Sequence, residues 1–299
     1  MNNPKNTAIT ALCLANIVWG STFVVVKESV AQVDTFVISA FRCLSAAIVL
    51  GAYIYWKDRS VFKSQIDIKN GFVLGLILAS IYVSQAFALN FTSSAHSAFI
   101  TVSSTILTPV VLVMFFKTKE TAKGWLFILL SFVGIYLLTF KPGSSEINSD
   151  IVFGDLITFA AALVCALQLI YSGKFVQKGS FLALIFYQFL FGGLLSLAGS
   201  FLSPSAVWSF PNDSIYYLLY LGLLGTLYCY FVTVWAQKFV STIATAMIFA
   251  MEPIFAGTFS YLWFGEELGV KELTGATLIL ISVIFYQIKD KIRSPFSKA

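Results

Sequence analysis

The chain of 299 residues is 58% hydrophobic and only 11% charged, with a mean hydropathy of +0.86. A soluble globular protein is about 45–50% apolar and about 25% charged, so these values exclude a water-exposed fold for most of the chain. The net charge of +5 comes from basic residues scattered through short segments, which gives no basis for a nucleic-acid partner. The composition predicts an integral membrane protein.

Ten apolar stretches are long enough to cross a bilayer, for which a helix needs about 20 residues. We expect spans over 7–26, 35–56, 71–89, 95–116, 123–140, 155–173, 181–201, 214–235, 241–264 and 271–288. The polar segment KPGSSEINSD divides these spans into two groups of five. We therefore predict two units, over residues 1–143 and 144–299.

Basic residues are distributed unevenly between the two sides of the predicted spans. Fifteen of the 19 lysines and arginines fall on the side that holds both chain ends, three (Lys27, Lys141 and Lys271) fall on the opposite side, and Arg42 lies within a span. Cytoplasmic loops carry the excess of lysine and arginine. The sequence therefore predicts a multi-pass protein of the cytoplasmic (inner) membrane with both termini in the cytoplasm.

The two groups of spans show an internal similarity. Ser97–Phe116 aligns without gaps with Ser241–Ser260, and their prolines, Pro109 and Pro253, coincide. Because five spans is an odd number, the second group enters the membrane from the opposite side to the first. The prediction is an all-α fold of ten transmembrane helices in two inverted five-helix repeats, a transporter design with its site near the midplane.

Several motifs resemble the EamA branch of the drug/metabolite transporter superfamily. They are NIVWGSTFVVVKE (16–28), FALNFTSSAHSAFI (87–100) and LGLLGTLYCYFVTVWAQKFVSTIATAMIFAMEPIFAGTFSYLWFGEEL (221–268). The resemblance covers nearly the whole chain. It implies two EamA units that move small organic solutes through a central cavity by alternating access. One departure is FFKTKE (115–120), which ends the fourth span where a Gly-Glu pair would match the second half.

The fourth span carries hydroxyl side chains on one helical face. They are Ser97, Thr101, Ser104 and Thr108, with Thr105 at the edge. These hydroxyls could bond back to carbonyls of their own helix, pack against another helix or form the polar wall of a cavity. Pro109 and Pro253 each leave the carbonyl four residues earlier without its usual donor, so we expect helix breaks that line a cavity.

Polar and aromatic residues in four other spans complete the predicted cavity wall. They are Trp19, Tyr82, Gln85, Gln168, Tyr171 and Tyr228. Each of them alone also suits a packed core, but together they indicate a small-molecule site with aromatic walls and a few polar anchors. Trp19 opens the run Trp-Gly-Ser-Thr, whose small residues suit either close helix packing or a bend that acts as a gate.

Two ionisable residues lie inside predicted spans, where a charge is costly and marks function. Arg42, in the first third of the second span, either snorkels to the interface or forms an ion pair or gate. Glu252 lies midway along the ninth span, where Thr108 stands in the first half. Glu252 could join a structural cluster, bind a cationic group of the substrate, or bind a proton and couple transport to pH, since desolvation favours the neutral acid.

The sequence thus predicts a secondary transporter, a permease or exporter, of small organic metabolites, with amino acids or related compounds as the leading substrate class. Drug-efflux or nucleotide-sugar-type carriers of the same superfamily are the alternatives, followed by a membrane protein without transport activity. With one histidine, His96, and no CxxC or HExxH motif, we predict no enzyme activity, metal or cofactor. The expected partners are a small-molecule substrate and the lipid bilayer, and the sequence specifies no oligomeric state.

Overall fold

The computed structural model describes residues 4–92, 97, 100–139, 149–203, 210, 214–264 and 269–292, and these residues contain helices and no strand. The helices are α1 (Pro4–Val30), α2 (Thr35–Lys57), α3 (Gln65–Ala88), α5 (Ser104–Phe116), α6 (Ala122–Thr139), α7 (Ser149–Phe175), α8 (Phe181–Leu202), α9 (Ser214–Gly222), α10 (Cys229–Ala236), α11 (Thr242–Phe249), α12 (Glu252–Phe264) and α13 (Val270–Ile292). A 3-10 turn, η1 (Arg59–Lys63), precedes α3, and a π-helical turn, η2 (Leu223–Tyr228), joins α9 to α10.

Within the described residues, seven helical stretches are long and apolar enough to cross a membrane. Three shorter apolar helices accompany them, over Ile100–Phe116, Ala122–Leu137 and Leu273–Lys289. Each predicted span coincides with one of these ten stretches, but the long helices extend further than predicted. For example, α3 begins at Gln65 because the Ser64 hydroxyl caps it, accepting the Asp67 N–H at 3.3 Å. Hydropathy identifies the part of a helix that lies in hydrocarbon and not its capped ends.

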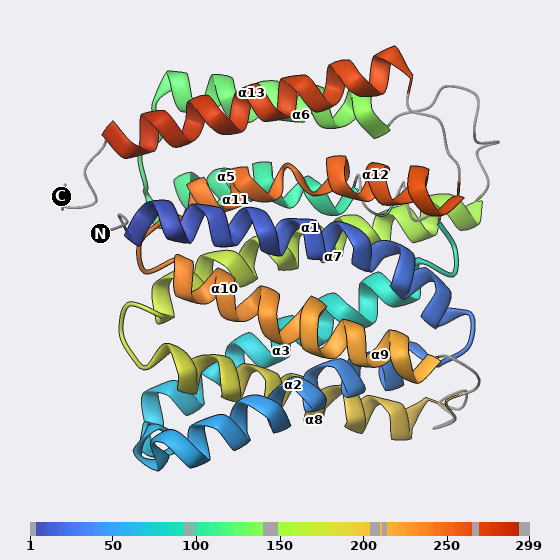
Figure 1. Cartoon of the computed structure of the whole chain (residues 1–299), viewed down its shortest axis with the longest axis vertical. Helices are drawn as coiled ribbons and strands as arrows, with labels where there is room; N and C mark the ends of the chain where they lie inside the picture. Colours follow the sequence, from blue (N-terminus) through green and yellow to red (C-terminus); the bar gives the residue numbers. More distant parts are fainter. Residues whose placement is uncertain are drawn as a thin grey trace.

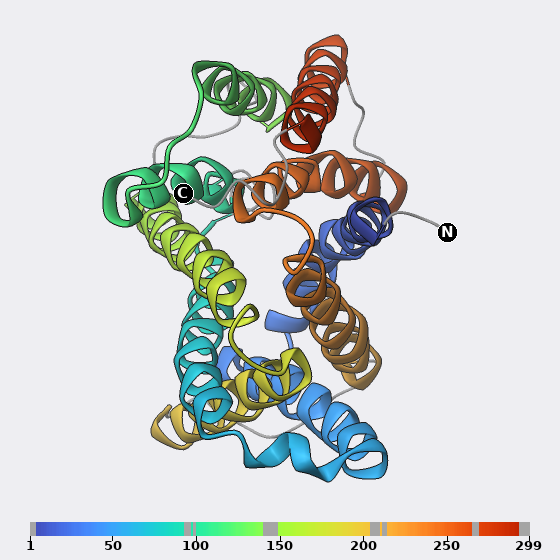
Figure 2. The ribbon, with the colours of Figure 1, turned by 90° about the vertical axis from the view of Figure 1, so that its left-hand side faces the viewer.

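The helices lie side by side with their axes roughly aligned and form a ring that is seen end-on in Figure 2. One wall consists of α3 and α7, and the opposite wall consists of α1 and the α9–η2–α10 segment. The α2–α8 pair closes one end of the ring, and α5, α11 and α12 close the other. The α6–α13 pair packs outside α5, α11 and α12 (Figure 1). The ring surrounds a cavity that is lined by side chains of both halves of the sequence.

Glycines allow α3 and α8 to pack closely beside this space. A Cβ added to Gly75 would lie 2.8 Å from the Gly192 backbone nitrogen and 2.9 Å from the Gln188 carbonyl oxygen. In a bilayer, helices associate largely by such van der Waals contact, and small residues permit it. This packing fixes the position of α3, which carries Tyr82 and Gln85 towards the ring centre.

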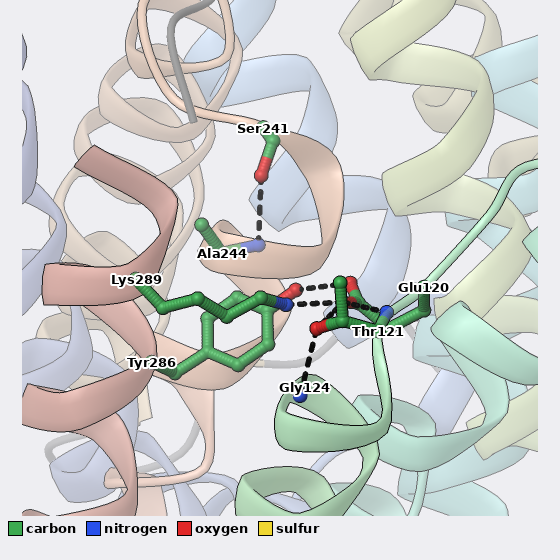
Figure 3. A network of polar contacts seen from close by, with 7 residues as sticks. All are labelled: Glu120, Thr121, Gly124, Ser241, Ala244, Tyr286 and Lys289. Atoms are coloured by element: carbon green, nitrogen blue, oxygen red, sulfur yellow. Dashed lines mark hydrogen bonds and ion pairs between the residues drawn. The ribbon is translucent and has the colours of Figure 1, made fainter. Parts of the chain in front are cut away.

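A polar cluster ties the link between α5 and α6 to the end of α13 (Figure 3). The Glu120 side chain is 3% exposed and forms an ion pair with Lys289. It also accepts the Tyr286 hydroxyl at 2.7 Å and the Thr121 backbone N–H at 2.6 Å. The FFKTKE segment, which departs from the family pattern, thus supplies a carboxylate that anchors the last described helix.

The pKa of Glu120 lies below its ordinary value. Burial favours the neutral acid, but hydrogen bonds from Lys289, Tyr286 and the Thr121 backbone stabilise the carboxylate and outweigh burial. The folded protein therefore keeps Glu120 ionised at a lower pH than the unfolded chain does. The cluster contributes its full stability above the unfolded pKa of about 4.3 and loses it as the pH falls through the lower, folded value.

We predict that Glu120→Gln destabilises the detergent-purified protein at pH 7 by about 1–2 kcal/mol, since the variant loses charge-assisted hydrogen bonds. Thermal melts from pH 7 down to about pH 3 should show a larger decrease in Tm for the wild type than for the variant, because only the wild type loses an ionised Glu120. Parallel pH dependences of the two proteins would contradict the anchoring role of this carboxylate.

Candidate functional site

A cavity of about 130 Å³ occupies the centre of the ring. Side chains from α1, α2, α3, α5, α7, α10, α11 and α12 form its wall, together with residues just before α5. Among the described residues, α6, α8 and α13 contribute none of the lining. Helices from both halves of the sequence therefore meet around one cavity.

Most of the residues that the sequence singled out lie on this wall. From the predicted cavity set these are Trp19, Tyr82, Gln85, Thr101, Ser104, Thr105, Thr108, Gln168 and Glu252. Arg42, predicted as an ion-pair or gate residue, lies on the wall as well. The stripe of hydroxyl residues before Pro109 faces the cavity, although the Thr108 hydroxyl also bonds back to the Ser104 carbonyl at 2.8 Å.

Two of the predicted lining residues point elsewhere. Tyr171 packs against Phe116 and Phe175, with ring centroids 6.3 and 5.5 Å apart. Tyr228 lies two residues after Thr226, and successive residues of a helix are rotated by about 100°, so the two side chains leave opposite faces. Tyr230, four residues after Thr226, lines the cavity instead. The spacing of Thr226, Tyr230 and Thr233 could have identified the inward face of this helix.

Aromatic rings form a continuous row along one side of the cavity. Tyr82 and Tyr230 have ring centroids 6.2 Å apart, Tyr230 and Trp19 are 5.4 Å apart, and Trp19 and Phe249 are 4.9 Å apart. All three pairs are edge-to-face, an arrangement that aligns positive ring edges with negative faces. The row combines residues of α1, α3, α10 and α11 and gives the cavity a rigid apolar side.

The π-helical turn η2 joins three other helices to this wall. The Trp19 indole donates to the Gly225 carbonyl at 2.9 Å. The Thr226 hydroxyl accepts Arg42 Nε at 3.2 Å and lies 3.0 Å from the Tyr82 hydroxyl. One turn thus holds side chains of α1, α2 and α3. Single π-helical turns recur at functional sites.

Several buried polar atoms on the wall have no hydrogen-bond partner among the described residues. They are both amide atoms of Gln168 and the hydroxyls of Ser97 and Thr105. Gln85 is partly satisfied, since its amide donates to Thr101 Oγ1 at 3.3 Å. A buried polar group without a partner costs about 1–3 kcal/mol. These groups are therefore available to a polar ligand.

The two intramembrane charges lie on the same cavity without pairing to each other. Arg42, 6% exposed, donates Nε to Thr226 and places its guanidinium 3.8 Å from the centre of the Tyr82 ring. Glu252 is half-buried and forms no hydrogen bond or ion pair with any residue that the structure describes. The sequence left three roles open for Glu252: membership of a structural cluster, binding of a cationic group of the substrate, or binding of a proton. The described residues supply no partner for the first of these roles.

The helix breaks differ between the two prolines. Pro253 is the second residue of α12, and the chain leaves helical geometry just before it, at Ala250 and Met251. Asn16 from α1 bonds to the Ile248 carbonyl there at 2.8 Å. Pro109 instead lies inside α5, and the interruption occurs earlier, at Ser103. The sequence predicted a break at Pro109 itself. In the structure the interruption lies six residues earlier, at Ser103, and Pro109 is accommodated within a helix.

The chain matches the EamA-like transporter family over residues 6–140 and again over residues 152–287. It belongs to this family. An uncharacterized transporter of Archaeoglobus fulgidus is 27% identical, over 93% of this chain and 85% of the relative. The S-adenosylmethionine uptake transporter of Rickettsia felis is 24% identical, over 97% of each chain. One crystal structure shares the fold with a TM-score of 0.78 at 14% identity, covering 96% of this chain and 99% of the other.

The EamA-like family and these relatives are transporters and not enzymes, so this chain is a multi-pass membrane transporter. Its central cavity is the candidate site for a small molecule. His96 and the GEEL segment (265–268) lie outside the described residues. The chemistry of the cavity therefore depends on the polar, aromatic and charged groups described above.

We predict that Thr226→Val lowers stability by about 1–3 kcal/mol, because the buried Arg42 loses a hydrogen-bond acceptor. Thr158→Val is the matched control, since the equally buried Thr158 hydroxyl donates only to the Gly154 carbonyl of its own helix, at 2.9 Å. Thermal melts in detergent should show a clearly larger decrease in Tm for Thr226→Val. Equal decreases would mean that η2 does not organise the wall.

Proposed function

We propose that this EamA-like transporter is a secondary carrier of small organic metabolites, with amino acids and related compounds as its substrate class, that works by alternating access through the central cavity. The observation that carries the proposal is the set of unpartnered polar groups on a wall that is otherwise largely apolar. The amide of Gln168, the carboxylate of Glu252 and the terminal nitrogens of Arg42 form no hydrogen bond within the described residues. A polar solute would supply the hydrogen-bond partners that these groups lack.

We also propose ten transmembrane helices arranged as two inverted repeats, over 1–143 and 144–299. The helix packing supports this arrangement. When each helix is replaced by its counterpart in the other half, a contact between two helices becomes another contact that is also observed. The α1–α12 contact corresponds to α7–α5, α3–α7 to α10–α1, and α3–α8 to α9–α2. The α2–α8 and α6–α13 pairs correspond to themselves, as pairs on a two-fold axis must.

For the membrane orientation we propose cytoplasmic termini in the inner membrane. The first turn of α1 and the last turn of α13 lie at the same end of the bundle in Figure 1. The link between α5 and α6, which carries Lys117 and Lys119, meets α13 near Lys289 at this end. The excess of basic residues there favours the cytoplasmic side.

The substrate is proposed to be small. A cavity of about 130 Å³ is close to the engineered cavity of about 150 Å³ that binds benzene, so this conformation holds a solute the size of a small amino acid. Some relatives are named S-adenosylmethionine uptake transporters, and that solute, which contains an amino-acid group, would also need a wider cavity than this conformation has. Drug-efflux and nucleotide-sugar transport are the alternatives, and both would require a wider cavity in another conformation.

Solute counterflow into proteoliposomes tests the proposal. Vesicles containing the purified protein, preloaded with an L-amino acid, should take up the labelled amino acid faster than empty vesicles, with saturation and without chemical change. A panel of amino acids, purines and sugars separates the substrate classes. If none of these solutes exchanges, the proposed function is wrong.

A second prediction concerns Gln168. Gln168→Leu should decrease exchange by about tenfold or more, because a polar anchor is lost, while Tm stays equal or rises, because unpartnered buried polar atoms are removed. Gln188→Leu is the matched control, since the Gln188 amide is also buried and unpartnered but lies on α8, away from the cavity. The control should preserve exchange. Equal exchange by both variants would exclude Gln168 from the site.

A further inference from the structure

The guanidinium of Arg42 lies at the cavity with part of its hydrogen-bonding capacity unused. Its Nε donates to Thr226 and its guanidinium lies 3.8 Å from the centre of the Tyr82 ring, but its two terminal nitrogens form no hydrogen bond among the described residues. Arginine has donors suited to binding a carboxylate through two parallel hydrogen bonds. Stacking on Tyr82 and the bond to Thr226 fix the guanidinium and leave its terminal edge free for such an anion.

Glu252 presents the complementary group. Its carboxylate lines the same cavity at the start of α12, and no described cation lies within ion-pairing distance of it. Leaving a charge unpaired inside a membrane protein is costly, so such residues mark pathways and ligand sites. Arg42 and Glu252 line the same cavity but form no ion pair with each other. Each of them retains the capacity to bind an opposite charge.

The aromatic row connects the two charges. It begins at Tyr82 under Arg42, continues through Tyr230 and Trp19, and ends at Phe249, three residues before Glu252. A ligand that lies along this row therefore meets a cation at one end, an apolar wall along its length and an anion at the other end. This order of groups is the chemical complement of a zwitterion whose two charges are separated by an apolar body.

We propose that the cavity binds its substrate as a zwitterion, with the carboxylate of the solute on Arg42, its ammonium on Glu252 and its carbon skeleton against the aromatic row. The inference rests on the proposed function and adds that one solute must carry both charges. A solute with only one charge leaves the opposite protein charge unpaired in a medium that solvates it poorly. Selectivity therefore comes from the pair of charges and not from either alone.

The first experiment measures inhibition of amino-acid counterflow in proteoliposomes by a series of probes. Linear ω-amino acids from glycine to 6-aminohexanoate vary the distance between the two charges, and n-butylamine and butyrate each carry only one of them. We expect inhibition to pass through an optimum with chain length, and the two singly charged probes to inhibit at least about tenfold more weakly than the best zwitterion. Singly charged probes that inhibit equally well would overturn the zwitterion site.

Two charge-neutralising variants then test which protein charge binds the carboxylate of the solute and which binds its ammonium. Arg42→Gln should reduce the preference for the best zwitterion over butylamine, whereas Glu252→Gln should reduce the preference for that zwitterion over butyrate, each by about tenfold. Gln188→Leu is the control that should leave both preferences unchanged. If Arg42→Gln does not fold, Arg42→Lys keeps the charge, loses the forked geometry, and should weaken the zwitterion while its preference over butylamine persists. Variants that weaken all probes equally would overturn the assignment.

These outcomes separate the two levels of the interpretation. If no amino acid, purine or sugar exchanges, the proposed transport function fails, and the zwitterion site fails with it. If amino acids exchange but butylamine and butyrate compete as well as zwitterions do, the carrier function stands and only the paired-charge site is wrong.

Discussion

Inside a bilayer, polar groups of a protein have no water to bond to, and every backbone or side-chain group left without a partner costs free energy. Among the described residues, four of the eleven buried polar side-chain atoms without a hydrogen-bond partner lie on the cavity wall. The turn at Thr226 shows how other polar groups find partners within the protein. A single hydroxyl accepts Arg42 and meets Tyr82, while the neighbouring Gly225 carbonyl accepts Trp19. The same constraint that forces the outside of the bundle to be apolar concentrates its polarity at the centre.

The sequence predicted the membrane class, the positions of the helices and most of the cavity wall, because these depend on hydropathy and on helical spacing. The hydroxyl stripe from Ser97 to Thr108 was found from periodicity alone, and it lines the cavity. Tyr171 and Tyr228 were misplaced because an aromatic residue suits a core as well as a ligand wall. The π turn and the interruption at Ser103 were missed because both depend on hydrogen-bond register, to which composition and periodicity are insensitive.

The two intramembrane charges are also the places where the halves of the chain differ most. Glu252 corresponds to Thr108 when Ser97–Phe116 is aligned with Ser241–Ser260. Arg42 corresponds to Gln188 when α2 and α8 are aligned at their capping residues, Asp34 and Ser180. A fold built from two similar halves would give a ligand two equivalent orientations. Under the proposed inverted repeat, only one half of the chain carries each of these charges, so the two halves are not chemically equivalent around the cavity.

The close approach of α1 and α12 has a mechanical consequence. A Cβ on Gly20 would lie 2.6 Å from Phe255 Cβ and 2.9 Å from the Ala256 backbone nitrogen, so the two helices touch through their main chains. Helices packed this tightly have no room to slide past each other, and α1 runs unbroken from Pro4 to Val30. Trp19 and Glu252 therefore belong to one tightly packed pair of helices, whereas Arg42 lies on α2 and contacts this pair through η2. A movement that separates α2 from α1 would therefore have to break the hydrogen bond at Gly225 or the one at Thr226.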